Sequence, residues 1–237
     1  MLINKYISET GYCSRRETTR RIAAGRITIN GKVCVKGDTV QSGDVVLMDG
    51  ESIPQRNPEA VYILLNKPVG IVCTAAEHVE GNIIQYVNYP ARIFAVGRLD
   101  KASEGLILMT NDGDIVNKMM RSEHNHEKEY IVTVDKPVSD SFIQQMSAGV
   151  EILNVVTKPC EVQRQNEKVF RIILTQGLNL QIRRMCQALG YRVLKLERVR
   201  IMNITLDDQL KRGEWRHLQK QELELLMSRL NDPGHEE

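Results

Sequence analysis

Apolar residues near the start of the chain recur with the period of two short helices. Residues 2–7 place their apolar side chains at helical spacing, and Gly11 ends this first predicted helix. Ser14, followed by Glu17 three residues later, has the capping-box spacing that begins a helix. We therefore predict a second helix from Ser14 that ends at Gly25.

The pattern then changes from helical spacing to short apolar runs. Residues 27–32 predict a strand that enters an Asn-Gly turn, and the valines that follow supply further short strands. Later strands are expected over residues 61–65, 93–96, 106–109, 129–134, 168–174 and 192–200. Later helices are expected over residues 114–121, 139–148 and 180–189, the last with Asn179 as its N-cap. Strands outnumber helices and often follow one another directly, so we predict an α+β fold with a mixed, mostly antiparallel sheet.

A polar stretch with a proline at each end, residues 54–58, interrupts the apolar pattern and predicts a linker. We expect a small N-terminal domain over residues 1–53, a linker over 54–60 and a larger domain over 61–230. Residues 231–237 form a short acidic tail.

Composition narrows the class of protein. The 237 residues are 42% hydrophobic and 26% charged, a mixture typical of a globular protein with a real core. No apolar run is long enough for a membrane span or a secretory signal, so we expect a cytoplasmic protein. The five cysteines are widely spaced and lack a Cys-x-x-Cys pair, so we expect reduced thiols and no metal.

Positive charge is concentrated in two segments although the net charge is only +2. Residues 1–36 hold eight basic and two acidic side chains, and residues 181–200 hold six basic and one acidic. On the second predicted helix Arg15, Arg16 and Arg20 share one broad face that Arg21 widens. This clustering favours a nucleic-acid partner over two ordinary solvated faces.

The N-terminal pattern resembles the S4-type RNA-binding domain. The resemblance covers about residues 2–49 and rests on the arginine helix, the glycine turn and the Ile29-Asn30-Gly31-Lys32 hairpin, which follow in that order. It implies that this domain binds structured RNA through the RNA backbone, with Lys32 as a further contact.

Candidate chemistry lies in the polar loop between two apolar strands, over residues 97–105. Asp100 stands here between Arg98 and Lys101, which favour its ionised form. By itself this loop favours an ordinary turn aspartate over a catalytic one.

Four motifs along the chain together resemble one group of ribosomal RNA pseudouridine synthases. This group contains the small-subunit synthase A and the large-subunit synthases B, E and F. The motifs are Asn66-Lys67-Pro68-Val69-Gly70, Gly97-Arg98-Leu99-Asp100, Glu127-Lys128-Glu129-Tyr130 and Gln181-Ile182-Arg183-Arg184-Met185. Gly213-Glu214-Trp215-Arg216 matches the group as well, so the resemblance runs from about residue 2 to 230.

The resemblance implies isomerisation of a uridine to pseudouridine in structured RNA, with no cofactor or metal. Asp100 matches the catalytic aspartate, Arg183 the arginine that pairs with it, and Tyr130 the tyrosine that stacks on the target base. A carboxylate can serve as a base, as a nucleophile or as a stabiliser of positive charge on the sugar, and these roles stay open here. Lys67, Pro68 and Leu99 are expected to shape the pocket.

The target base must be flipped out of folded RNA, and contacts to the RNA backbone must offset the lost stacking. We expect Arg198 and Arg200, two residues apart on a strand, to share one face and supply such contacts. Further RNA contacts are expected from Arg98, Lys101, Gln181, Arg184 and Asn203. Leu180 departs from the group, which often carries a polar or basic residue at this position.

Other functions compatible with these residues are a non-catalytic S4-type RNA-binding or ribosome-assembly protein, and a methyltransferase. The missing glycine-rich cofactor turn argues against a methyltransferase. By resemblance the preferred RNA is 23S ribosomal RNA, with 16S ribosomal RNA or a tRNA anticodon loop as alternatives.

Overall fold

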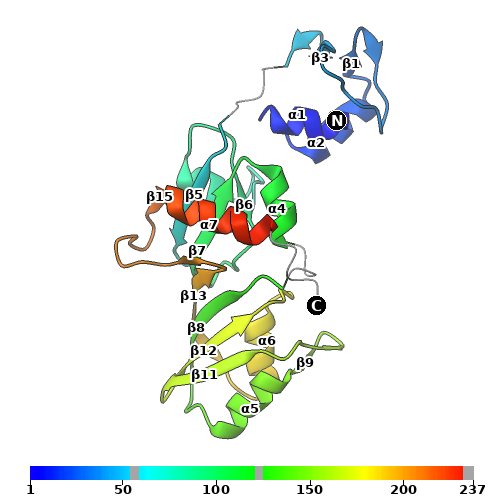
Figure 1. The fold of residues 1–237 in the computed structure, drawn as a ribbon. Helices are drawn as coiled ribbons and strands as arrows, with labels where there is room; N and C mark the ends of the chain where they lie inside the picture. Colours follow the sequence, from blue (N-terminus) through cyan, green and yellow to red (C-terminus); the bar gives the residue numbers. More distant parts are fainter. Residues whose placement is uncertain (54–58, 121–124, 232–237) are drawn as a thin grey trace. The chain divides into compact units, whose positions relative to one another are not determined.

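The computed structural model describes residues 1–53, 59–120 and 125–231, and the chain divides into two compact units (Figure 1). The first unit is Met1–Val61 with Pro90–Arg92 and Asn111–Gly113, and the second is Tyr62–Tyr89, Ile93–Thr110 and Asp114–Glu237. The predicted linker falls mainly on residues 54–58, and the predicted acidic tail mainly on 232–237. Both segments lie outside the described residues.

The first unit contains two helices and a small antiparallel sheet. Helix α1 (Ile3–Glu9) precedes α2 (Arg15–Ala23), and the strand order is β2 (Lys32–Val33), β1 (Ile27–Ile29), β3 (Val46–Met48), β4 (Glu51–Ser52). The Ser14 side chain accepts the Glu17 amide N–H at 3.1 Å, so the predicted N-cap is confirmed. Asn30 and Gly31 both have positive φ, as the predicted two-residue hairpin turn requires.

The second unit is built on a nine-stranded sheet that is antiparallel except at one pair of strands. Its main path runs β11 (Glu161–Asn166), β12 (Val169–Leu174), β8 (Lys128–Val134), β13 (Val193–Ile201), β7 (Glu104–Thr110), β5 (Tyr62–Lys67), β15 (Trp215–His217). Strand β14 (Ile204–Thr205) pairs with β13, and β6 (Phe94–Val96) pairs with β7. The predicted α+β class with a mostly antiparallel sheet is confirmed.

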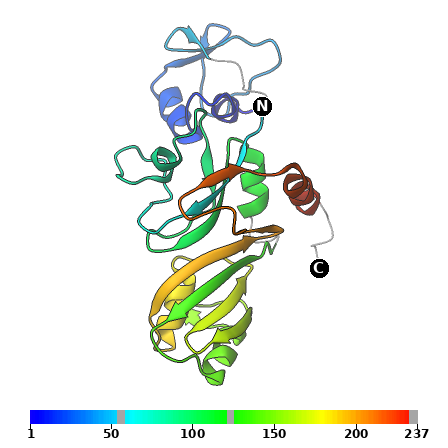
Figure 2. The same cartoon turned by 90° about the vertical axis from the view of Figure 1, so that its left-hand side faces the viewer.

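Helices lie against the two halves of this sheet (Figure 2). Two hydrophobic clusters hold them there. Helices α5 (Asp140–Ala148) and α6 (Gln181–Ala188) pack on β8, β12 and β13 through residues such as Phe142, Met185 and Phe170. Helices α4 (Gly113–Met120) and α7 (Lys220–Asn231) pack on β5 and β7 through Met119 and Leu226. A short helix α3 (Ile83–Val87) and the hairpin of β9 (Glu151–Ile152) and β10 (Val155–Val156) complete the unit.

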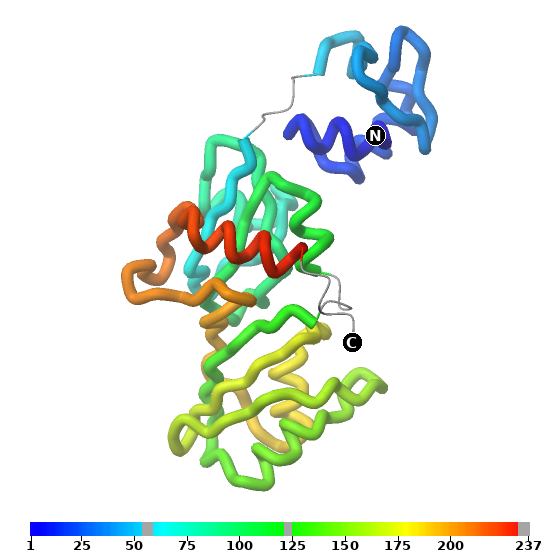
Figure 3. The backbone as a smooth tube through the Cα atoms, viewed as in Figure 1, coloured from blue at the N-terminus to red at the C-terminus, as the bar shows by residue number. Residues whose placement is uncertain are grey.

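The two halves of the sheet meet where β13 lies parallel to β7 (Figure 3). Only two positions are in register there, Glu197 with Glu104 and Arg198 with Gly105. Gly105 has a φ of +102°, and a Cβ atom on it would lie 2.3 Å from the carbonyl oxygen of Arg198. The junction therefore requires a residue without a side chain at position 105.

Three general features bear on function. All five cysteines are free thiols. Among the described residues, no helix is long and apolar enough to cross a membrane. The same part of the chain contains no group of three or more His, Cys, Asp or Glu side chains that could hold a metal ion.

Candidate active site

The loop between β6 and β7 carries Asp100 and is held in place by hydrogen bonds on both sides of that residue. The buried Leu99 donates its amide N–H to Cys73 Sγ at 3.4 Å, and the Lys101 carbonyl accepts the Gly70 amide at 2.8 Å. The Asp100 carbonyl accepts the Ser103 amide at 3.0 Å, and the Asp100 side chain lines the adjacent cavity.

Lys67 also holds the loop that carries Asp100 in place. Its side chain is fully buried, and its Nζ donates to the carbonyl oxygens of Pro68 and Ser103, both at 2.8 Å. Burial lowers the pKa of Lys67, and the nearby charge of Asp100 partly opposes this change. Lys67 and Pro68 thus support the wall of the cavity, although neither lies on its surface.

Arg183 reaches the loop from α6 and donates to one backbone carbonyl and one side-chain hydroxyl. Its Nη2 donates to the Ala102 carbonyl at 2.8 Å and to Ser103 Oγ at 3.1 Å. We expected an ion pair with Asp100, but no such pair within 4.0 Å is present among the described residues. The guanidinium binds Ala102 and Ser103 instead of the Asp100 carboxylate. The Nε atom of Arg183 is buried and has no acceptor among the described residues.

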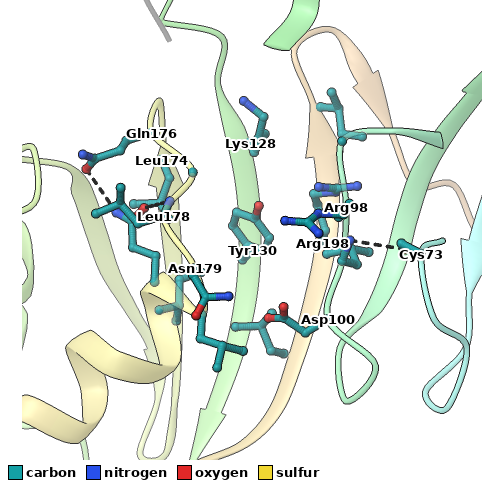
Figure 4. Close-up of a pocket in the computed structure, with 18 of the residues that line it drawn as sticks. Cys73, Arg98, Asp100, Lys128, Tyr130, Leu174, Gln176, Leu178, Asn179 and Arg198 are labelled. Carbon is teal, nitrogen blue, oxygen red and sulfur yellow. Dashed lines mark hydrogen bonds between the residues drawn. The ribbon is translucent and has the colours of Figure 1, made fainter. Parts of the chain in front are cut away.

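These elements enclose a cavity of about 430 Å³ at the junction of the two sheet halves (Figure 4). Its floor is formed by β8 and β13, with Tyr130 in the middle and Arg198 directly across from it on the neighbouring strand. Lys128 lies on one side of Tyr130 and Asp100 on the other. A carboxylate, an aromatic ring and several cations therefore share one half-open cavity of a size that suits a small ligand.

The start of α6 differs from the sequence prediction. The N-cap position is Leu180, which has a φ of +51° and makes no side-chain cap, so the prediction of Asn179 as N-cap is wrong. Asn179 instead accepts from Arg184, through its carbonyl at 3.0 Å and its side-chain oxygen at 3.2 Å. Gln181 is buried, and its Oε1 accepts the Leu178 amide at 2.9 Å.

Arg198 and Arg200 do not share a face of β13. The register of β13 against β8 shifts between these two residues, and this β-bulge reverses the alternation that their spacing predicts. Arg198 is buried and lines the cavity opposite Tyr130. Arg200 pairs with Glu129 at 2.7 Å and Glu127 at 3.0 Å. Burial opposes ionisation of Glu129, but hydrogen bonds from Arg171 and Arg200 lower its pKa overall.

Comparison with known proteins identifies the family. Residues 61–188 match the RNA pseudouridylate synthase family, and residues 1–46 match the S4 domain. The chain belongs to the RNA pseudouridine synthase family. The loop that carries Asp100 and strands β5 to β8, β11 and β12 lie within the residues that match the pseudouridylate synthase family.

The similarity to individual pseudouridine synthases extends over nearly the whole chain. The dual-specificity RNA pseudouridine synthase RluF of Escherichia coli K12 is 55% identical over 93% of this chain and 76% of its own length. The ribosomal small subunit pseudouridine synthase A of Yersinia pestis is 35% identical over 94% of this chain and 97% of its own. A crystal structure of a pseudouridylate synthase matches with a TM-score of 0.70 and 29% identity over 95% of this chain and 99% of that one.

The structure separates the predicted RNA-binding residues of this pseudouridine synthase by environment. Arg15, Arg16, Arg20 and Lys32 are exposed on the first unit, and Arg98 and Lys101 are exposed at the cavity. The half-buried Arg21 is held by Glu17 at 3.0 Å. Asn203 donates its side-chain amide to the Glu222 carbonyl at 3.1 Å, which is a contact within the fold.

Sequence reasoning missed three contributors to the site: Cys73, Ser103 and Lys128. Cys73 and Ser103 hold the ends of the Asp100 loop through contacts that no local pattern encodes. Lys128 could have been found, because it lies two residues before Tyr130 on the same strand and must therefore share its face.

Proposed function

We propose that this protein converts uridine to pseudouridine in structured RNA with Asp100 as its catalytic group, and that 23S ribosomal RNA is its principal substrate. The observation that carries the proposal is the position of Asp100, whose carboxylate faces a 430 Å³ cavity floored by Tyr130. The reaction breaks the bond from the base to the ribose, turns the base over and rejoins it through carbon. A carboxylate beside the sugar and an aromatic face beside the base suit both steps.

Five residues have assigned roles in this proposal. Asp100 acts on the flipped nucleoside, and Tyr130 stacks on its base. Arg183 is a positioning residue, because it binds Ala102 and Ser103 and so fixes the loop on which Asp100 stands. Arg98 and Lys101, exposed at the mouth of the cavity, face the RNA backbone.

Residues 1–53 serve as a separate RNA-binding domain in this proposal, and residues 61–230 as the catalytic domain. The exposed arginines of α2, Arg15, Arg16 and Arg20, support this division, since they form a cationic face without a catalytic group.

A second RNA substrate is favoured by relatives that are 54% and 55% identical and are named dual-specificity enzymes. We expect a tRNA anticodon loop to be the second substrate, since it too can present a flipped uridine from a hairpin.

Release of tritium from RNA labelled at uracil C5 tests the proposal, because C5 exchanges its hydrogen for the bond to ribose. Transcripts of 23S ribosomal RNA, 16S ribosomal RNA and tRNA are compared with wild type, Asp100→Asn and the exposed control Asp208→Asn. Wild type and the control should release tritium from 23S RNA, whereas Asp100→Asn should not. If wild type releases tritium from none of these RNAs, or if Asp100→Asn stays active, the proposal fails.

A further inference from the structure

Two cationic side chains line the floor of the cavity and have no role in the reaction as outlined. Lys128 belongs to β8, two residues before Tyr130, and Arg198 belongs to β13, directly across from Tyr130. Both line the cavity that Asp100 faces, and Lys128 lies on the opposite side of Tyr130 from Asp100 (Figure 4).

Neither cation has an anionic partner among the described residues. Lys128 Nζ donates to the His126 carbonyl at 2.9 Å, and Arg198 Nε donates to the Leu106 carbonyl at 2.7 Å. Arg198 is only 3% exposed, and its Nη2 is buried without any acceptor in that part of the chain. Arg200, on the same strand, shows the contrast, because two glutamates neutralise it.

Keeping two unpaired cations in a half-buried cavity is unfavourable for the empty protein. Burial lowers the pKa of Lys128 from 10.5 to about 8, and the charge of Arg198 contributes to this change. A buried guanidinium nitrogen without an acceptor also loses its hydrogen bond to water. Such a cost is tolerated where a ligand supplies the missing anion.

We propose that Lys128 and Arg198 form an anion subsite that binds a backbone phosphate of the flipped nucleotide. The proposal rests on the proposed function, which places a nucleotide of RNA in this cavity. Uracil and ribose are neutral, so the phosphodiester is the group of the substrate that can neutralise two cations. A neutral carbonyl of the base could accept from Arg198 but would leave the charge of both side chains uncompensated.

The subsite holds the ribose of the target nucleotide in place during the reaction. When the base is detached and turned, the ribose must stay within reach of both Asp100 and the base. A phosphate held by Lys128 and Arg198 anchors the ribose through its ester oxygen while Tyr130 faces the moving base. The two cations are therefore expected to contribute to binding of the nucleotide and to the rate of the chemical step.

A binding experiment tests the subsite without requiring turnover. The full chain is titrated with uridine 3′-monophosphate, uridine 5′-monophosphate and uridine, and the Tyr130 ring signals are followed by nuclear magnetic resonance. At pH 7 wild type should bind at least one nucleotide about 10- to 100-fold tighter than uridine, as hydrogen bonds to a charged group imply. Lys128→Met should lose this preference, Lys128→Arg should keep most of it, and the exposed control Lys168→Met should keep all of it.

A cycle that combines a change in the protein with a change in the RNA tests the subsite during catalysis. A short RNA substrate is made with a neutral methylphosphonate on the 5′ or the 3′ side of the target uridine, and single-turnover rates are compared with those of unmodified RNA. One of the two replacements should slow wild type about 10- to 100-fold and should have little further effect on Lys128→Met. Arg198→Met should show the same loss of sensitivity, provided that it retains the wild-type unfolding midpoint.

The outcomes separate this inference from the proposed function. If Lys128→Met keeps the preference for nucleotide over uridine, or if it stays fully sensitive to the methylphosphonate, the anion subsite is wrong even when the enzyme is active. If wild type shows the phosphate preference at Lys128 but releases no tritium from RNA, the subsite stands and the proposed function fails.

Discussion

Replacement of Gly105 by alanine should destabilise the catalytic domain by opening the junction between β7 and β13. Two costs add at this position. An L-residue at a φ of +102° is strained by about 1–2 kcal/mol. The new Cβ would also lie 2.3 Å from the carbonyl oxygen and 2.7 Å from the amide nitrogen of Arg198, both backbone atoms that cannot rotate away. Overpacking of this kind costs about 1–3 kcal/mol, so the total is about 2–5 kcal/mol.

Gly70 provides the matched control, because it also has a positive φ, +96°, but no atom lies within 4 Å of its would-be Cβ. Gly70→Ala should therefore show the backbone strain alone, about 1–2 kcal/mol. Urea unfolding gives both free energies, and tritium release gives the activity. Gly105→Ala should lose more stability than Gly70→Ala and should lose activity as well, because Arg198 moves with β13. Equal losses in the two variants would refute the requirement for close approach at the junction.

Three further predictions concern single charges. Lys128 has a pKa of about 8 against 10.5 when unfolded, so the unfolded chain binds the extra proton between these values. The stability of wild type relative to Lys128→Met, measured by urea unfolding at each pH, should therefore rise from pH 8 to 10.5. Hydrogen bonds from Arg216 at 2.7 and 2.8 Å lower the pKa of Glu222. Arg216→Met should therefore lower the free energy of unfolding by about 2 kcal/mol at pH 7. Urea unfolding should show this loss becoming smaller as the pH falls below 4.5, where Glu222 becomes protonated. Arg15→Ala should weaken RNA binding and reduce the slope of log affinity against log salt by about one, as filter binding at several salt concentrations would reveal, without lowering the tritium release rate at saturating RNA.

Local signals in the sequence predicted the elements that local interactions determine. The cap of Ser14 on Glu17 and the Asn30-Gly31 turn involve residues close together in the chain, and both are present in the structure. The same reasoning found the boundaries of α5, whose Ser139 side chain accepts the Phe142 amide at 3.1 Å. The short strands β11 and β15 were missed because an edge strand with few buried residues has little apolar pattern.

Contacts that the simple capping and alternation rules leave out explain the failures at the site. Asn179 has the side chain of a good N-cap, but Arg184 occupies its oxygens and the helix begins from Leu180 instead. The alternation rule placed Arg198 and Arg200 on one face because it assumes a regular strand. The residue types at these positions do not predict the bulge that lies between them.

The bulge in β13 and the glycine in β7 are parts of the same local arrangement. Gly105 lets the backbone of Arg198 approach β7, and Arg198 Nε then reaches the Leu106 carbonyl at 2.7 Å. The register shift that follows turns Arg200 toward Glu129 and so keeps a second unpaired guanidinium out of the cavity. The motif around Asp100 is thus visible in the sequence as a string of residues, whereas the charge of the cavity that it faces depends on how two distant strands meet.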